Sequence, residues 1–509
     1  MAERRSGRER SAAQRWDDFF RRLRRQGISA RVLFAMFLGF LALAVQNSPL
    51  KQSTFLSTWD TALFDQVVRV HRNTVAGHAQ PVVIATFGGK SREAWYQAHP
   101  EGAAGSRGVD DLPAATPLGV IADALNSANR MYARVAVVDI DVTARIADRR
   151  PEELKAFTDF LQTWEADPRA PLLVLVRSHL PRNPDEAGGA AAPSPWDALV
   201  ASAPNIAWAT SNGEASNDGV LRLQHYYECV SLNGKVQALA SAPVTALTAT
   251  LYPTPEGAKA ALAAALARHP LCSPRKRIHT GGKADFELGP GFDLSPARGR
   301  PIRFDSQGGL IDYHLDDPER GGVAPPLPHG EWADGARALT MWDTGDLFDA
   351  LGPDVGGGAI VIVGARQPLS PDLQWTPYSE IDGDLVLANA ARGLALIGPI
   401  HDLPLWMQIA GLITMILAIH LFYRLNMVLN ARAHGIDRGW LRFIVMGATS
   451  AAMSKLYALA LLYAAGMVIG SWLLSLGYWQ STPFIGASIY VLMGDAIELI
   501  GGGKLEQGD

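Results

Sequence analysis

Two acidic residues lie at the end of an apolar run that predicts a buried β-strand. The run extends from Arg134 to Ile140, and Asp139 and Asp141 are two residues apart, so their side chains would lie on one face of the chain. Ligands in open α/β sheets bind at the carboxyl ends of strands, and both carboxylates are therefore candidates for holding a small molecule or a cation. The structural alternative is that Asp139 caps the turn that follows the strand.

Three further positions combine a polar side chain with a turn. Gly89-Lys90-Ser91 has the form of the end of a phosphate-binding loop, but Ile84 stands where that loop needs its first glycine, which favours a tight turn. Arg222 follows the turn signal Asp218-Gly219 and can either pair with Asp218 or hold a carboxylate ligand. Thr376-Pro377 predicts a rigid turn in which Thr376 can line a pocket. Lys90, Ser91, Arg222 and Thr376 are thus candidate ligand residues.

The residue types give little support for catalysis or metal binding. No serine stands on the pattern of a nucleophile elbow, and no His or Cys lies at ligand spacing near Asp139. The chain has two cysteines, Cys229 and Cys272, which are too few for a four-cysteine zinc site. We expect no enzyme activity, no metal and no cofactor.

The charge distribution separates a short basic end from an acidic remainder. The 509 residues carry 46 basic and 50 acidic side chains, a net charge of −4. Ten arginines stand against four acidic residues in positions 1–31, so this segment carries +6 and the rest −10. A nucleic-acid-binding protein would concentrate positive charge on its folded part, so we expect no nucleic-acid partner. A mean hydropathy of +0.05 fits a large polar domain joined to a few membrane spans.

Four apolar stretches predict helices that cross a membrane. Three are C-terminal, at 403–423, 456–476 and 483–500, and each is close to the roughly 20 residues that a bilayer core requires. The fourth, at 32–46, is short. An uncleaved anchor is favoured there over a signal peptide, although Ala42-Leu43-Ala44 has the small residues of a cleavage site.

Positive charge predicts the orientation of these spans. The arginine-rich segment 1–31 is expected in the cytoplasm, and so is the loop after the first C-terminal span. That loop carries four arginines: Arg424, Arg432, Arg438 and Arg442. The uncharged turn at 477–482 is expected outside. Residues 47–402 then form a periplasmic domain of a multi-pass inner-membrane protein, and 501–509 form a short cytoplasmic tail. Because the periplasm is oxidising, we expect Cys229 and Cys272 to form a disulfide; the alternative is two unrelated buried thiols.

A few residues in the C-terminal spans are candidates for coupling or packing. Lys455 begins one span, whereas Asp495 and Glu498 end the antiparallel span that follows, so all three lie at one depth. A contact between Lys455 and Asp495 would lower the cost of charge near the core, and simple interfacial exposure is the alternative. Gly466 and Gly470 allow close approach of another helix, either within the subunit or from a second copy.

The predicted periplasmic segment alternates strand and helix patterns. Continuous apolar runs predict buried strands of a mostly parallel sheet: Pro81 to Phe87, Arg134 to Ile140, Leu172 to Arg177 and Ala359 to Gly364. Helical patterns also occur: Ala114 to Asn129, Glu152 to Glu165, Pro195 to Ser202 and Gly257 to Arg268. The fold class is therefore α/β, a large sandwich domain with an N-terminal anchor helix and three C-terminal transmembrane helices.

Several phrases of this segment resemble the type-2 CHASE domain, an extracellular sensory domain of bacterial cyclases and kinases. They occur in the family's order: Lys90-Ser91 after a strand, Val137 to Ile140, Asn217 to Arg222, Gly309 to Tyr313, Ile360 to Gly364, Asp372 to Pro377, then Gly383 and Ala388-Asn389-Ala390. The three-span C-terminal region is also similar to that of the family. The resemblance implies a membrane-anchored sensory domain.

The sequence also departs from the family pattern. Gly88 and Gly89 stand where two acidic residues are usual, and Leu387 stands where a histidine is common. No cyclase, kinase or phosphodiesterase segment follows the last predicted span. The resemblance therefore implies a sensor or receptor subunit that signals through its membrane helices to a separate protein partner. The alternative is a structural or assembly subunit of an envelope complex that uses the domain as a protein-binding platform. A homo-oligomer in the lipid bilayer is compatible with both.

Overall fold

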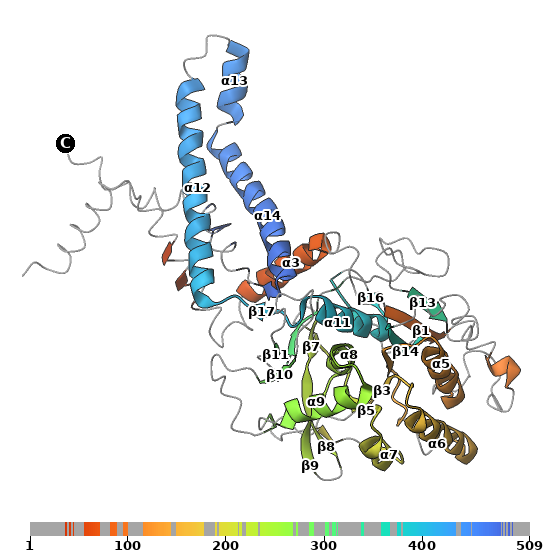
Figure 1. Ribbon diagram of the computed structural model, residues 1–509. Helices are drawn as coiled ribbons and strands as arrows, with labels where there is room; N and C mark the ends of the chain where they lie inside the picture. The colour runs from red at the N-terminus through yellow and green to blue at the C-terminus, as the bar shows by residue number, and fades with distance from the viewer. Residues whose placement is uncertain are drawn as a thin grey trace, which may run out of the picture. The chain divides into compact units, whose positions relative to one another are not determined.

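A computed structural model of the chain (Figure 1) divides it into two compact units. The helical unit comprises Met1–Val70, Asp402–Leu473 and Tyr478–Asp509, and the α/β unit comprises His71–His401 and Leu474–Gly477. The structure describes residues 36–37, 40–41, 44, 55–71, 82–88, 95–99, 116–143, 149–177, 189–190, 193–211, 213–215, 220–232, 235–267, 271–272, 285–289, 301–304, 308–311, 313, 337–340, 358–366, 374–377, 380–433, 439–448, 450–479, 481, 484, 487–488 and 491.

A six-stranded parallel sheet forms the centre of the α/β unit. Its strands, in spatial order, are β13 (Arg337–Thr340), β1 (Val82–Gly88), β14 (Ile360–Arg366), β2 (Val135–Val138), β3 (Leu172–Val176) and β5 (Ile206–Ala209). Every neighbouring pair is parallel. All four predicted buried strands lie in this sheet, which confirms the α/β class with a mostly parallel sheet. The buried β-branched runs suit a sheet that is covered on both faces.

Helices cover both faces of this sheet. One face packs against α5 (Leu118–Arg130), α6 (Pro151–Ala166) and α7 (Asp197–Ser202), which share a core with alternate strand residues. The other face packs against α8 (Ala242–Leu251) and α11 (Gly383–Ile397). The sequence patterns predict α5 to begin at Ala114, but Pro117 is extended (φ −60°, ψ 134°) and the helix begins after it. They did not predict α8, which is apolar all round because it is buried.

Smaller sheets and one further helix complete the α/β unit. β7 (Leu221–His225) pairs with β12 (Gly308–Leu310) and β6 (Gly213–Ala215), and β8 (Tyr227–Leu232) pairs with β4 (Gly189–Ala190) and β9 (Lys235–Ala240). Two hairpins are β10 (Phe286–Leu288) with β11 (Ile302–Phe304), and β15 (Gln374–Trp375) with β16 (Glu380–Ile381). With α9 (Pro255–Ala267) and α8, part of this region forms a second core, in which the rings of Phe286 and Phe304 stack at 4.4 Å.

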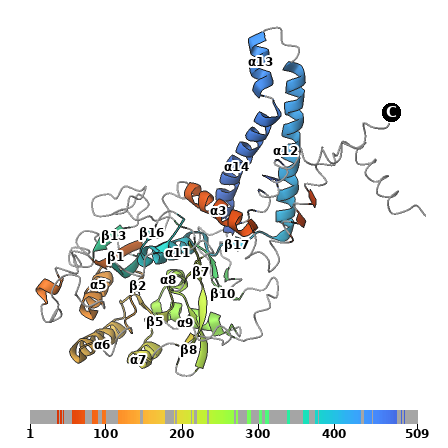
Figure 2. The ribbon, with the colours of Figure 1, turned by 180° about the vertical axis from the view of Figure 1, so that it is seen from behind.

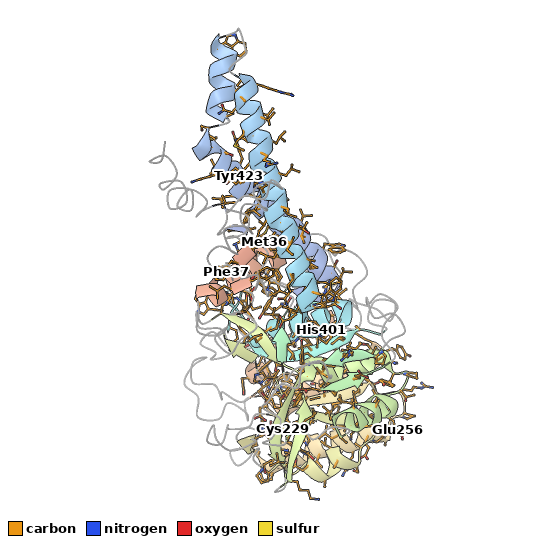
Figure 3. All side chains as sticks on the ribbon, turned by 90° about the vertical axis from the view of Figure 1, so that its left-hand side faces the viewer. Met36, Phe37, Cys229, Glu256, His401 and Tyr423 are labelled. Atoms are coloured by element: carbon orange, nitrogen blue, oxygen red, sulfur yellow. A yellow bond between two sulfur atoms is a disulfide. The ribbon has the colours of Figure 1, made fainter. Side chains whose placement is uncertain are left out.

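A disulfide lies beside this second core. It joins Cys229 on β8, labelled in Figure 3, to Cys272, whose Cα atom lies 5.5 Å away, and it closes a loop of 43 residues. In the chain-entropy treatment such a loop stabilises the fold by about 4 kcal/mol. We expect neither cysteine to react with a thiol reagent in denaturant until a reductant is added. Labelling of both cysteines without reductant would show that the protein lacks the bridge.

The helical unit contains two long apolar helices that lie side by side. They are α12 (Leu405–Ala433) and α14 (Ala451–Ser475), whose ribbons run beside one another both from the front and from behind (Figures 1 and 2). Leu412 and Ile416 of α12 pack with Leu462 of α14, and Met36 and Tyr423, labelled in Figure 3, pack against the same cluster. Shorter elements are α3 (Phe55–His71), α13 (Gly439–Ala448) and β18 (Tyr478–Trp479), and β17 (His401–Asp402) lies at the unit boundary.

Two of the four predicted membrane spans are matched by helices of sufficient length. Leu405–Ala433 and Met453–Ser475 are long and apolar enough to cross a membrane. The predicted spans 32–46 and 483–500 fall mostly outside the described residues, so they remain predictions.

Candidate functional site

The carboxyl ends of the parallel strands meet at one edge of the central sheet, where ligands of open α/β sheets bind. Asp139 directly follows β2, and its N–H donates a hydrogen bond to the carbonyl oxygen of Val363 at 2.8 Å. This bond extends the pairing of β2 with β14 and places Asp139 at the edge. Asp141 lies two residues further on, and both side chains are partly exposed.

Asp141 has a structural role in this turn. Its Oδ1 atom accepts hydrogen bonds from the backbone N–H and the hydroxyl of Thr143, at 2.8 and 2.6 Å. A carboxylate that binds the backbone two residues on forms an Asx-turn. The sequence analysis gave a turn cap as the alternative role of Asp139, and the structure shows that Asp141 also binds within this turn.

A buried carboxylate on α11 lies at the same edge of the sheet and contacts β1 and β14. Asp384 is 4% exposed, and its Oδ2 accepts a hydrogen bond from the hydroxyl of Thr86 at 2.8 Å. Gly364 of β14 makes room for it, because a Cβ atom there would lie 2.5 Å from the Cβ of Asp384. Asp382, two residues before Asp384, is also buried, and so is Thr376, which follows β15 in a separate two-stranded sheet. The side chains described here at the ends of β1 and β2 and on the first turn of α11 are carboxylates and a hydroxyl, which suit a cationic or hydroxyl-bearing ligand.

A buried ion pair stands at the end of the neighbouring strand β3. The guanidinium of Arg177 bonds both carboxylate oxygens of Asp197, at 2.6 and 3.4 Å, and its side chain is 1% exposed. The Cζ atom of Arg177 also lies 5.0 Å from the ring centre of Trp208 on β5. Because Asp197 is the first residue of α7, the pair fixes that helix to the sheet.

A comparison with known protein families identifies this architecture. The sequence model of the CHASE2 domain matches residues 34–422, which is more than half of the chain. The chain belongs to the CHASE2 domain family. Searches among curated proteins and among solved structures each found no match. This match confirms the resemblance that the ordered sequence motifs indicated. CHASE2 domains are sensory domains.

The CHASE2 fold does not gather all the predicted ligand residues at one edge. Arg222 is buried on β7, in the sheet with β12 and β6, and its carbonyl oxygen accepts the N–H of Ile311 at 2.8 Å. Lys90 and Ser91 lie outside the described residues. Among the residues that the structure describes, no group of three His, Cys, Asp or Glu side chains is placed to hold a metal ion.

Two partly buried cations hold helices of the CHASE2 domain in place. Arg134 donates to the carbonyl oxygens of Ala249, Tyr252 and Pro253 at the end of α8, and burial lowers its pKa. Lys259 donates to the carbonyl oxygens of Val200 and Ala203 at the end of α7. Burial lowers the pKa of Lys259, and the nearby Glu165 opposes the shift. A positive charge at the C-terminus of a helix is stabilising, so both side chains have a structural role.

The predicted helix-packing glycines contact neighbours within the helical unit. A Cβ atom on Gly470 would lie 2.8 Å from Val67 of α3, and one on Gly466 would lie 3.4 Å from Phe484. Trp479, which also lies near Gly470, binds α3 as well: its Nε1 donates a hydrogen bond to Asp60 at 3.0 Å. These contacts account for both glycines by packing within one subunit. Lys455 is partly exposed, whereas Asp495 and Glu498 lie outside the described residues, so their contact stays a prediction.

Proposed function

We propose that the protein is an inner-membrane sensor or receptor subunit of a bacterium. Its CHASE2 domain would lie in the periplasm, bind a small ligand or a protein, and signal through its membrane helices to a separate partner. Family membership carries this proposal, because CHASE2 is a sensory domain family. Two helices of membrane-spanning length in the same chain support it.

The connection between α11 and α12 supplies a direct route for the signal. α11 ends at Ile397 and α12 begins at Leu405, so a short segment joins a helix of the sensory domain to a helix of spanning length. The N-terminus of α11 carries Asp384, which bonds Thr86 at the carboxyl edge. A ligand that binds at this edge and displaces Asp384 would move α11, and α12 would follow because the chain is continuous.

Asp139 is the described residue best placed to contact such a ligand. It is partly exposed at the carboxyl edge, whereas the neighbouring Asp384 is buried. Asp141, with Oδ1 bound to Thr143, is a weaker candidate. We expect no catalytic activity, since the proposed role requires only binding and movement.

The second candidate is an assembly role in an envelope complex, with the domain as a protein-binding platform. Its support is the departure of the chain from the family pattern at Gly88, Gly89 and Leu387. Leu387 is buried in α11, so an apolar residue occupies the helix where a histidine is common in the family. This role needs a protein interface and no small-molecule site.

Affinity purification from native membranes distinguishes the two functions. The tagged full chain would be cross-linked in cells, purified and analysed by mass spectrometry, with an unrelated inner-membrane bait as the control. We expect specific recovery of a signalling enzyme with a cytoplasmic domain, such as a cyclase, kinase or phosphodiesterase. Recovery of secretion or polysaccharide-export proteins alone would favour the assembly role.

A further inference from the structure

β9 lies at the outer edge of a three-stranded sheet. The strand order in this sheet is β4, β8 and β9, so β9 pairs with β8 on one side, and no described strand continues the sheet on the other. β8 and β9 run beside each other at the lower end of the α/β unit in Figure 1. An edge strand carries a row of backbone groups that can pair with a further strand.

The backbone hydrogen bonds at the end of β9 show which of its residues point outward. The carbonyl oxygen of Ala240 accepts the N–H of Thr210, which follows β5, at 3.1 Å and therefore points away from β8. The N–H of the next residue, Ser241, points the other way and donates to Tyr226, just before β8, at 2.9 Å. Successive residues of an antiparallel strand alternate in this respect, so the residues two and four before Ala240 also point outward.

These two residues, Val236 and Ala238, have no partner for their outward backbone groups within the part of the chain that the structure describes. Val236 is 47% exposed, and its neighbours Lys235 and Gln237 are exposed as well. Each of the two outward residues offers one N–H donor and one C=O acceptor to a further strand. We call residues 235–239 the open edge.

The open edge lacks the features that usually protect an edge strand, which are proline, charged side chains, a β-bulge or a cover. Residues 236–239 contain no proline and no charge. All residues from Lys235 to Ala240 pair with β8 without a shift of register. The disulfide supports the strand from behind, because Cys229 on β8 lies opposite Ala238. A supported and unprotected edge is suited to pair with another extended segment.

The same strand of a second copy fits this edge. With a twofold axis at Gln237, the two strands run antiparallel, and Val236 of each copy faces Ala238 of the other. The outward N–H and C=O groups then bond one another. The one charged side chain of the open edge, Lys235, faces Leu239 of the other copy, so like charges do not oppose each other.

Confinement to one membrane favours a second copy over a soluble peptide. A pair of short strands buries less than the roughly 1,200–2,000 Å² that stable interfaces bury in solution. Two copies in one bilayer meet at a raised effective concentration, so a smaller interface is sufficient. This step rests on the membrane position of α12 and α14 in the proposed function.

We propose that the open edge of β9 is a dimer interface, at which two copies of the chain pair their β9 strands about a twofold axis at Gln237. The pairing joins the two three-stranded sheets into one continuous sheet. It requires neither a ligand nor a signalling partner.

Disulfide cross-linking of the full chain in native membranes tests the pairing. Both native cysteines form the bridge, so Gln237→Cys would carry the only free thiol. Residues opposite each other in a non-hydrogen-bonded pair have Cα atoms about 4.5 Å apart, which a disulfide can span. After mild oxidation we expect most of this variant at twice the 54.7 kDa mass of the chain, and a reductant should return it to the mass of one chain.

Further variants test whether the cross-link depends on the open edge. Lys155→Cys, at an exposed position of α6, should stay at the mass of one chain. Val236→Pro removes an outward N–H from each copy and leaves the bonds to β8, so together with Gln237→Cys it should lower the cross-linked fraction about tenfold. Val236→Thr keeps that N–H and should leave the fraction unchanged.

Formation of the Cys229–Cys272 bridge serves as the folding check for these variants. If the proline variant fails this check, Val236→Lys replaces it. The lysine keeps the backbone intact and brings positive charges together near the axis, so it should also lower the fraction.

A Gln237→Cys chain that stays at the mass of one chain after oxidation would overturn the proposal. Equal cross-linking of Lys155→Cys would do so too, because random collisions would then account for the dimer. So would a fraction that the folded Val236 variants leave unchanged, and so would a cross-link to a different protein, which would then occupy the edge. The assay needs no signalling partner, and it can be repeated on the purified chain in detergent. Absence of the chain from membranes would therefore count against the proposed function alone.

Discussion

Replacing Gly364 with alanine is expected to lower the melting temperature of the α/β unit by roughly 6 °C. The added Cβ atom would lie 2.5 Å from the Cβ and 2.6 Å from Oδ2 of Asp384, and the neighbouring strands β1 and β2 leave β14 little freedom to move. Overpacking costs about 1–3 kcal/mol, and displacing the buried carboxylate from Thr86 adds about 1.5–3 kcal/mol. A total of about 4 kcal/mol gives this shift in a unit of this size.

Thermal unfolding of the full chain in detergent, followed by tryptophan fluorescence, measures the effect. Gly119→Ala is the matched control, because its Cβ atom would meet Trp95 at an ordinary 3.6 Å and alanine favours a helix interior. The double variant Thr86→Val/Gly364→Ala should lose less than the sum of the single variants, since both act on Asp384. A Gly364→Ala protein as stable as the control would show that Asp384 does not occupy this position.

Asp197→Ala is expected to destabilise the α/β unit by about 3–5 kcal/mol. The substitution removes the carboxylate from a guanidinium whose side chain is 1% exposed, and water cannot replace it without opening the packing around Trp208. A buried charge is costly when its partner is removed, because no water replaces the lost interaction. An exposed charge keeps its hydration, so the loss of its partner costs little.

The chain offers a matched exposed pair as the control. Lys155 and Asp159 lie 2.6 Å apart, but their side chains are 76% and 57% exposed, so Asp159→Ala should cost less than about 1 kcal/mol. Arg177→Met/Asp197→Leu removes both buried charges and should recover most of the stability lost by Asp197→Ala. Equal effects of Asp197→Ala and Asp159→Ala in denaturant unfolding would contradict a buried pair.

The strongly patterned elements of the fold could be predicted from the sequence. Runs such as 359–364 and 172–177 are continuous and apolar because both sheet faces are covered, and both form strands of the central sheet. α8 was missed because a helix that is buried all round lacks an amphipathic period. The three-residue strands β6, β10 and β11 are too short to carry a period of two, so tertiary pairing decides them.

The candidate site could be predicted only in part. Asp139 and Asp141 follow a recognisable strand, and the structure places both at the carboxyl edge. Asp384 was missed because its partner Thr86 lies 298 residues away in the sequence. The glycine that ends the run 360–364 is the signal that could have indicated a close approach at this point. The pair Arg177–Asp197 was missed because a single sequence does not show which charges are buried together.

Reporter fusions test the central claim, that the sensory domain lies outside the cytoplasm and is connected through spanning helices. Alkaline phosphatase is active only after export, so the account predicts high activity for a fusion after Arg300 in the CHASE2 domain. A fusion after Arg438, in the basic loop between α12 and α14, should be inactive, while both fusion proteins are present at equal levels on immunoblots. Activity after Arg438 together with inactivity after Arg300 would place the domain in the cytoplasm and contradict the account.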